Sequence, residues 1–91
     1  MTIQAGLYSG RFSEKFRGFL VRYRVTCYQI SQLSGLSQAY LSRLKSGERQ
    51  NPSPETIIRI GIAGARLNSQ VGEEDVEHLL NSIGRSLRIM E

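Results

Sequence analysis

The sequence predicts an all-α protein, a compact bundle of about five helices, and three observations favour this class. Apolar residues recur every three or four positions in several segments, which is the spacing of the buried face of a helix. Valine and isoleucine do not alternate with polar residues, so no strand pattern competes. Serine, threonine and glycine stand where helices would begin and end. At 91 residues with 40% hydrophobic content, we expect one domain with a small core.

The composition disfavours several classes of protein. One cysteine leaves no internal disulfide framework and is typical of the reducing cytoplasm, and one histidine offers no ligand set for a metal. The sequence has no glycine-rich phosphate loop and no paired-carboxylate motif, so we expect no enzyme, no catalytic residue and no cofactor. No apolar run approaches the roughly 18 residues that a membrane span needs, and the N-terminus lacks a signal-peptide pattern. We therefore expect a cytoplasmic protein with no membrane partner.

The charge is unevenly distributed along the chain. The net charge is +4, but up to Arg66 there are ten lysines and arginines against three acids, and beyond it two against five. The first two thirds of the chain are thus basic and the last third is acidic. A basic body suggests a polyanion such as nucleic acid as the partner.

The first expected helix runs from its N-cap Ser13 to about Arg24, after a flexible arm at residues 1–12. The arm shows no periodicity, and disorder without a role is the simpler interpretation, although Arg11 would be able to reach a nucleic acid. One buried stripe marks the helix: Phe12, Phe16, Phe19, Leu20 and Tyr23.

Two short helices are expected next, joined by a tight turn. Thr26 caps the first, with Gln29 completing a Thr-x-x-Gln capping box, and Gly35 ends it with a positive φ. Ser37 caps the second helix, residues 37–46, and Gly47 closes it. Two helices this close form a helix-turn-helix. Small residues at Ser31 and Ser34 let the helices approach, and five apolar residues would fix their crossing: Ile30, Leu33, Leu36, Leu41 and Leu44.

Two further helices complete the expected bundle. Ser53 caps the fourth, with Pro54 at its first position, and its core side consists of Ile57, Ile58, Ile60 and Ile62. Gly61 and Gly64 inside this helix suggest a close approach by another helix, either within the chain or from a second chain. The last helix covers about residues 73–83, with Gly84 after it and acids in its first turn. Its apolar stripe is Val76, Leu79, Leu80 and Ile83.

The central stretch resembles a known family. The matching features are the Val-Thr opening, Ile30 and Ser31, then Gly35-Leu36-Ser37, Tyr40 to Leu44, Gly47, and the loop Pro52 to Thr56. With these features the chain resembles phage-repressor-like regulators of the lambda/434 repressor and Cro type, the XRE family, well over residues 13–67 and loosely elsewhere. The resemblance implies a lambda-repressor-like DNA-binding core at 13–67 and a C-terminal helix and tail at 68–91. It also implies a sequence-specific regulator of transcription that binds double-stranded DNA as a homodimer on a two-fold operator.

One departure from the family concerns how the motif is braced. Many members pair an arginine in the first helix with a glutamate near the end of the recognition helix. Leu20 and Lys45 stand at those two positions here, so no buried charge is left without its partner. We expect a hydrophobic contact to replace the ion pair and Lys45 to be free for a phosphate.

Residues 37–46 would be the recognition helix in the major groove, where side chains near its N-terminus reach base edges. Gln38 suits an adenine edge, Arg43 a guanine edge, and Ala39 a thymine methyl. A solvated helix face without a role is the alternative. The predicted base contacts are Gln38, Ala39, Ser42 and Arg43. The predicted phosphate contacts are Thr26, Cys27, Tyr40, Lys45, Ser46, Arg49, Gln50 and Asn51.

Two alternatives stay open. Cys27 at a helix start is conceivable as a redox switch, but a single thiol favours an ordinary small side chain. An antitoxin, or another protein-binding regulator of the same fold, is the second functional hypothesis. Its partner protein would bind residues 68–91, which are acidic and carry an apolar stripe.

Overall fold

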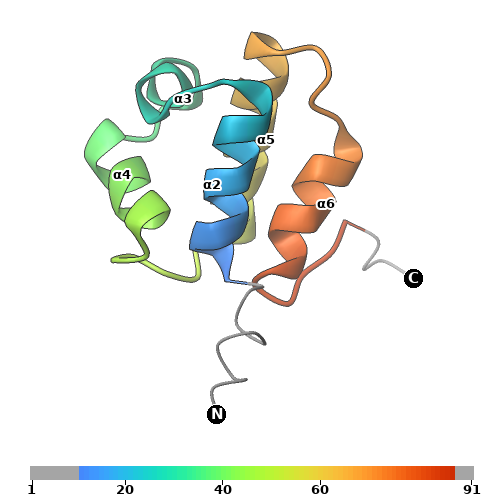
Figure 1. The fold of residues 1–91 in the computed structure, drawn as a ribbon. Helices are drawn as coiled ribbons and strands as arrows, with labels where there is room; N and C mark the ends of the chain where they lie inside the picture. The colour runs from blue at the N-terminus through green and yellow to red at the C-terminus, as the bar shows by residue number, and fades with distance from the viewer. Residues whose placement is uncertain (1–10, 88–91) are drawn as a thin grey trace.

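Helices make up the regular structure of residues 11–87, the part of the chain that this computed structural model describes (Figure 1). They are α2 (Phe12–Tyr23), α3 (Cys27–Ser34), α4 (Gln38–Ser46), α5 (Pro54–Leu67) and α6 (Glu73–Asn81). The prediction of an all-α fold is confirmed. None of these helices combines the length and the apolar character that crossing a membrane requires.

The helices are arranged around α2 and α5, which lie in the middle of the bundle. α3 and α4 lie on one side of them and α6 on the other (Figure 1). α2 packs against α4 and α6, while α5 packs against α3 and α6. Each helix contributes to one core, whose largest fully buried side chains are Phe16, Ile30, Leu41, Leu44, Ile57, Ile60, Leu79 and Leu80.

The predicted caps of the two motif helices and of α5 are confirmed. The Thr26 hydroxyl accepts from the Gln29 N–H at 3.1 Å, and the Gln29 side chain accepts from the Thr26 N–H at 2.9 Å. Ser37 and Ser53 cap α4 and α5 through bonds of 3.0 and 3.1 Å from the N–H three residues on. Gly35 has φ 81° and ends α3, so the turn takes a conformation that side chains rarely adopt.

The predicted N-cap of the first helix is wrong by two residues. Arg11, not Ser13, is the N-cap, and it makes no side-chain cap bond. Phe12, the last residue of the expected arm, is the first residue of α2. It is 4% exposed and stacks on Phe16 with 5.3 Å between ring centroids, so its predicted place in the buried stripe is confirmed. Burying an aromatic ring stabilises by roughly 1.5–3 kcal/mol, more than the ~1 kcal/mol of a serine cap. The rest of the expected arm, apart from Arg11, lies outside the described residues.

Three aliphatic residues that we expected in the core lie at the surface. Leu33 and Ile58 are each 37% exposed, and Ile62 is 58% exposed. In α5 the buried face follows Ile57, Ile60 and the two glycines, so residues 58 and 62 are rotated away from it. In α3 the eight-residue length buries only Ile30 and Ser34.

The glycines of α5 mark close approaches within the chain, which decides between our two alternatives. A Cβ added at Gly64 would lie 2.6 Å from Cζ of Phe19 on α2. A Cβ added at Gly61 would collide with a methyl group of Val76 on α6. The glycines therefore allow α5 to approach α2 and α6 closely.

A polar cluster ties α6 to the centre of the bundle. The Tyr23 hydroxyl donates to Asp75 at 2.6 Å, and the Gly72 N–H donates to the other oxygen of that carboxylate at 2.9 Å. The hydrogen bond to Asp75, together with burial, raises the pKa of Tyr23 above its ordinary value.

Helix α6 ends at Asn81, two residues earlier than predicted, and a turn follows to Gly84, whose φ is 77°.

Candidate nucleic-acid interface

α4 separates its residues cleanly into a core side and an outer side. Leu41 and Leu44 are fully buried, because they face the helices beneath. The four residues that we predicted to contact bases are all exposed on the outer side: Gln38, Ala39, Ser42 and Arg43. The start of the helix is capped by Ser37, so its N-terminal residues are held in a regular turn.

Within residues 11–87, the Arg43 side chain has one weak charged partner. Its Nε lies 3.9 Å from the Glu48 carboxylate, and both side chains are more than half exposed. A surface ion pair of this length contributes little to stability. The guanidinium is therefore able to exchange Glu48 for another acceptor at small cost.

The start of α3 offers free backbone donors beside a lysine. Among the described residues, the N–H groups of Cys27 and Tyr28 have no hydrogen-bond partner. The next two N–H groups of the helix are satisfied, because that of Gln29 donates to the Thr26 hydroxyl and that of Ile30 to the Thr26 carbonyl. Lys45 and Arg17 line the same hollow of about 220 Å³ as Thr26 and Cys27. A helix N-terminus with a nearby cation favours an anion. The structure thus brings together three of the predicted phosphate contacts: Thr26, Cys27 and Lys45.

The thiol of Cys27 is not activated. Its partial burial raises its pKa above the ordinary value, and the nearby Lys45 charge opposes this only in part. A reactive cysteine has a lowered pKa. An ordinary small side chain is therefore the better interpretation of this residue than a redox switch.

Of the remaining predicted phosphate contacts, Tyr40 lies in the first turn of α4, and the others lie at its end or in the loop after it. The Arg49 guanidinium lies over the half-buried Tyr40 ring, 5.6 Å from its centroid. The Ser46 hydroxyl donates to the Arg43 carbonyl at 3.1 Å, and the Gln50 side chain donates to the Gly47 carbonyl at 3.2 Å. Asn51 has φ 55° and turns the loop. The side chains of Ser46 and Gln50 thus bond to main-chain carbonyls close by in the sequence. The exposed Arg49 side chain lies beside α4.

The departure from the family is also visible in the structure. Leu20 is 5% exposed and belongs to the hydrophobic core, while Lys45 is exposed. No charged partner is buried between α2 and α4 at these positions. The residue that replaces the arginine is therefore buried in the core, and the residue that replaces the glutamate is exposed to solvent.

Two arginines that the sequence interpretation overlooked hold the motif. Arg17 of α2 donates to the Lys45 carbonyl at 2.7 Å, and Arg59 of α5 donates to the Ser34 carbonyl at 3.1 Å. The Glu55–Arg59 spacing of four residues was a readable signal for an ion pair on α5. No signal marks the contacts with α3 and α4, because both acceptors are main-chain atoms.

The comparison with known families agrees with this geometry. A family model described as helix-turn-helix matches residues 28–62, which cover nearly all of α3, all of α4, the loop and more than half of α5. No curated protein and no solved structure matches the chain. The segment that holds α3 and α4 is therefore a helix-turn-helix, similar to the type found in the lambda repressor and Cro (the XRE family).

Proposed function

We propose that this protein is a sequence-specific, double-stranded-DNA-binding regulator of transcription that acts as a dimer on a two-fold operator. The observation that carries the proposal is the outer face of α4. It presents an amide, a methyl, a hydroxyl and a weakly paired guanidinium side by side, while the opposite face is fixed in the core. These groups match the donor, acceptor and methyl pattern of base edges in the major groove.

Phosphate contacts would flank this face and set its register on the duplex. At one end, the free N–H groups of α3 and the Lys45 ammonium receive a phosphate in their shared hollow. At the other end, Arg49 receives a second one. The acidic α6 lies across the bundle from α4 (Figure 1), so this helix is away from the proposed DNA-reading face.

Selection of bound DNA from a random pool tests this function directly. We expect one enriched sequence with two related half-sites spaced by about 10 base pairs, because two copies of α4 would enter successive major grooves on one side of the duplex. Affinity should fall steeply with salt, with about 0.9 of logarithmic slope for each phosphate neutralised. Absence of enrichment together with salt-independent binding would refute the proposal.

An apolar groove between α5 and α6 supports the dimer. It measures about 310 Å³, has Gly61, Ala65 and Val76 among its lining residues, and is edged by the exposed Ile58 and Ile62. In a two-fold dimer the same surface serves both copies, and this surface carries both projecting isoleucines and a floor of small residues. Patches of this kind mark protein interfaces.

We expect Ile62→Glu to produce a monomer, because it would bury a carboxylate without a partner in the apolar interface. Sedimentation equilibrium should show the loss of the dimer, and affinity for the full operator should fall at least tenfold while binding to one half-site is unchanged. Asn81→Glu is the matched control, since it places the same charge on an exposed position of α6 outside the groove. A dimer that persists in Ile62→Glu would place the interface elsewhere.

The same groove is what favours the second candidate, an antitoxin or other regulator that binds a partner protein through its C-terminal helix. That function would be indicated by a wild-type protein that is monomeric alone and purifies from its host with a second protein. Ile62→Glu should then abolish that complex, and Asn81→Glu should leave it intact.

A further inference from the structure

We infer that Arg17 and Arg59 are positioning residues for DNA binding. Together they clamp the C-terminal ends of the two motif helices to the neighbouring helices. The inference rests on the proposed function, since it concerns how the DNA-reading helix is held. The two arginine contacts would hold the motif in place of the ion pair that many members of the similar family have and that Leu20 and Lys45 replace here.

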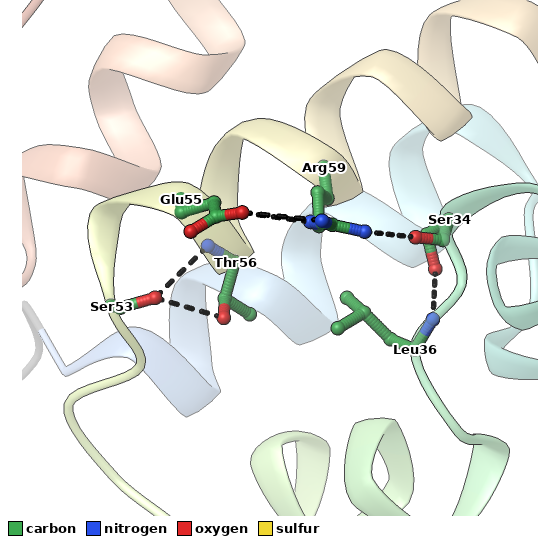
Figure 2. A network of polar contacts seen from close by, with 6 residues as sticks. All are labelled: Ser34, Leu36, Ser53, Glu55, Thr56 and Arg59. Carbon is green, nitrogen blue, oxygen red and sulfur yellow. Dashed lines mark hydrogen bonds and ion pairs between the residues drawn. The ribbon is translucent and has the colours of Figure 1, made fainter.

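The first contact holds the turn between the motif helices, as Figure 2 shows. Arg59 Nη1 donates to the carbonyl of Ser34, the last residue of α3, while Nε and Nη2 donate to Glu55 at 3.3 and 3.2 Å. The Ser34 hydroxyl in turn accepts from the Leu36 N–H at 3.1 Å, within the turn itself. The two acceptors together fix the planar guanidinium, which the single ammonium of a lysine would not reproduce.

The second contact completes the C-terminal cap of α4. The Gly47 N–H donates to the carbonyls of Arg43 and Leu44 at 3.1 and 3.3 Å, so these two are satisfied locally. The carbonyl of Lys45 is taken by Arg17 from α2 at 2.7 Å. Carbonyls at a helix end lack intrahelical donors and carry partial negative charge. A guanidinium satisfies both requirements through a charge-assisted bond.

The two contacts hold different parts of the helix-turn-helix in place. Arg59 ties the end of α3 and the turn to α5, and Arg17 ties the end of α4 to α2. The start of α3 and the outer face of α4 would have to meet the phosphate and the bases simultaneously, so small rotations between them would weaken binding. Both arginines are exposed, so their loss should loosen the motif without unfolding the core.

Arg59→Met tests the clamp, because it removes the donors and keeps much of the side-chain length. We expect faster amide hydrogen exchange at Leu36 in the free protein, with α6 amides unchanged. We also expect about fivefold to tenfold weaker operator binding with an unchanged salt slope. Arg66→Met is the matched control: it removes the same charge from α5 at an exposed position outside the clamp, and should leave exchange at Leu36 unchanged. For Arg17→Met we expect faster amide hydrogen exchange in the last turn of α4 in the free protein, and unchanged exchange there would remove Arg17 from the clamp. The salt slope is not its readout, because Arg17 also lines the hollow at the start of α3.

The salt slope separates the clamp from a direct DNA contact. A residue that touched a phosphate would lower the slope by about 0.9 when removed, and Arg59→Lys would restore both slope and affinity. For a clamp, Arg59→Lys restores the affinity only in part. A lowered slope, or unchanged exchange at Leu36, would overturn the inference. If the wild type binds no DNA, the proposed function fails, and the exchange experiment still decides whether the clamp exists.

Discussion

Gly64→Ala should lower the free energy of unfolding by roughly 1–3 kcal/mol, although alanine is the better helix former by about 1 kcal/mol. The new Cβ would lie 2.6 Å from Cζ of Phe19, a ring that is 5% exposed and has little room to move. Relief requires α2 and α5 to separate, and that separation would disturb the core beneath the motif. Urea denaturation monitored by circular dichroism measures the change.

Gly18→Ala is the matched control, since Gly18 also lies inside a helix but has no atom within 4 Å of the added Cβ. We expect this substitution to raise the free energy of unfolding by up to about 1 kcal/mol, through helix propensity alone. Opposite signs for the two variants would identify packing as the cause. A neutral or stabilising Gly64→Ala would mean that α2 and α5 are less tightly packed than the structure shows.

Arg43→Ala should relax the preference for one base pair in each half-site, with a loss of discrimination of about 1–3 kcal/mol there. The reason is that a bidentate guanidinium contact to a guanine edge carries sequence information that a methyl group lacks. The fold should be unaffected, because the 3.9 Å pair with Glu48 at the surface contributes little. Repeating the selection from a random pool with the variant provides the measurement.

Lys45→Ala distinguishes the recognition of base sequence from electrostatic attraction to the phosphates. It removes the same charge from the same helix, but from a residue in the hollow at the start of α3. We expect it to weaken binding to all sequences alike and to lower the salt slope by about one. An unchanged selected sequence for Arg43→Ala would show that the reading face of α4 has been assigned incorrectly.

Local features were predictable from the sequence where cause and effect lie within one turn. Thr26 with Gln29, Ser37, and Ser53 with Pro54 each cap a helix through a donor three residues away, so spacing alone specified the bonds. Ser13 failed because a distant partner competed: the core buries Phe12 and starts the helix earlier. The candidate reading face was equally predictable, since the positions of Leu41 and Leu44 determine which residues of α4 point outward.

By itself, then, the sequence determined the helical fold class, the caps of α3, α4 and α5, and the helix-turn-helix motif, because these depend on hydrogen bonds and periodicities within a few residues. The tertiary structure alone decided which isoleucines of α5 are covered. It left Ile58 and Ile62 at a groove, and it placed Gly64 against Phe19. It also decided that Arg17 and Arg59 brace the motif, because their acceptors are main-chain carbonyls 28 and 25 residues away, which no side-chain pattern records.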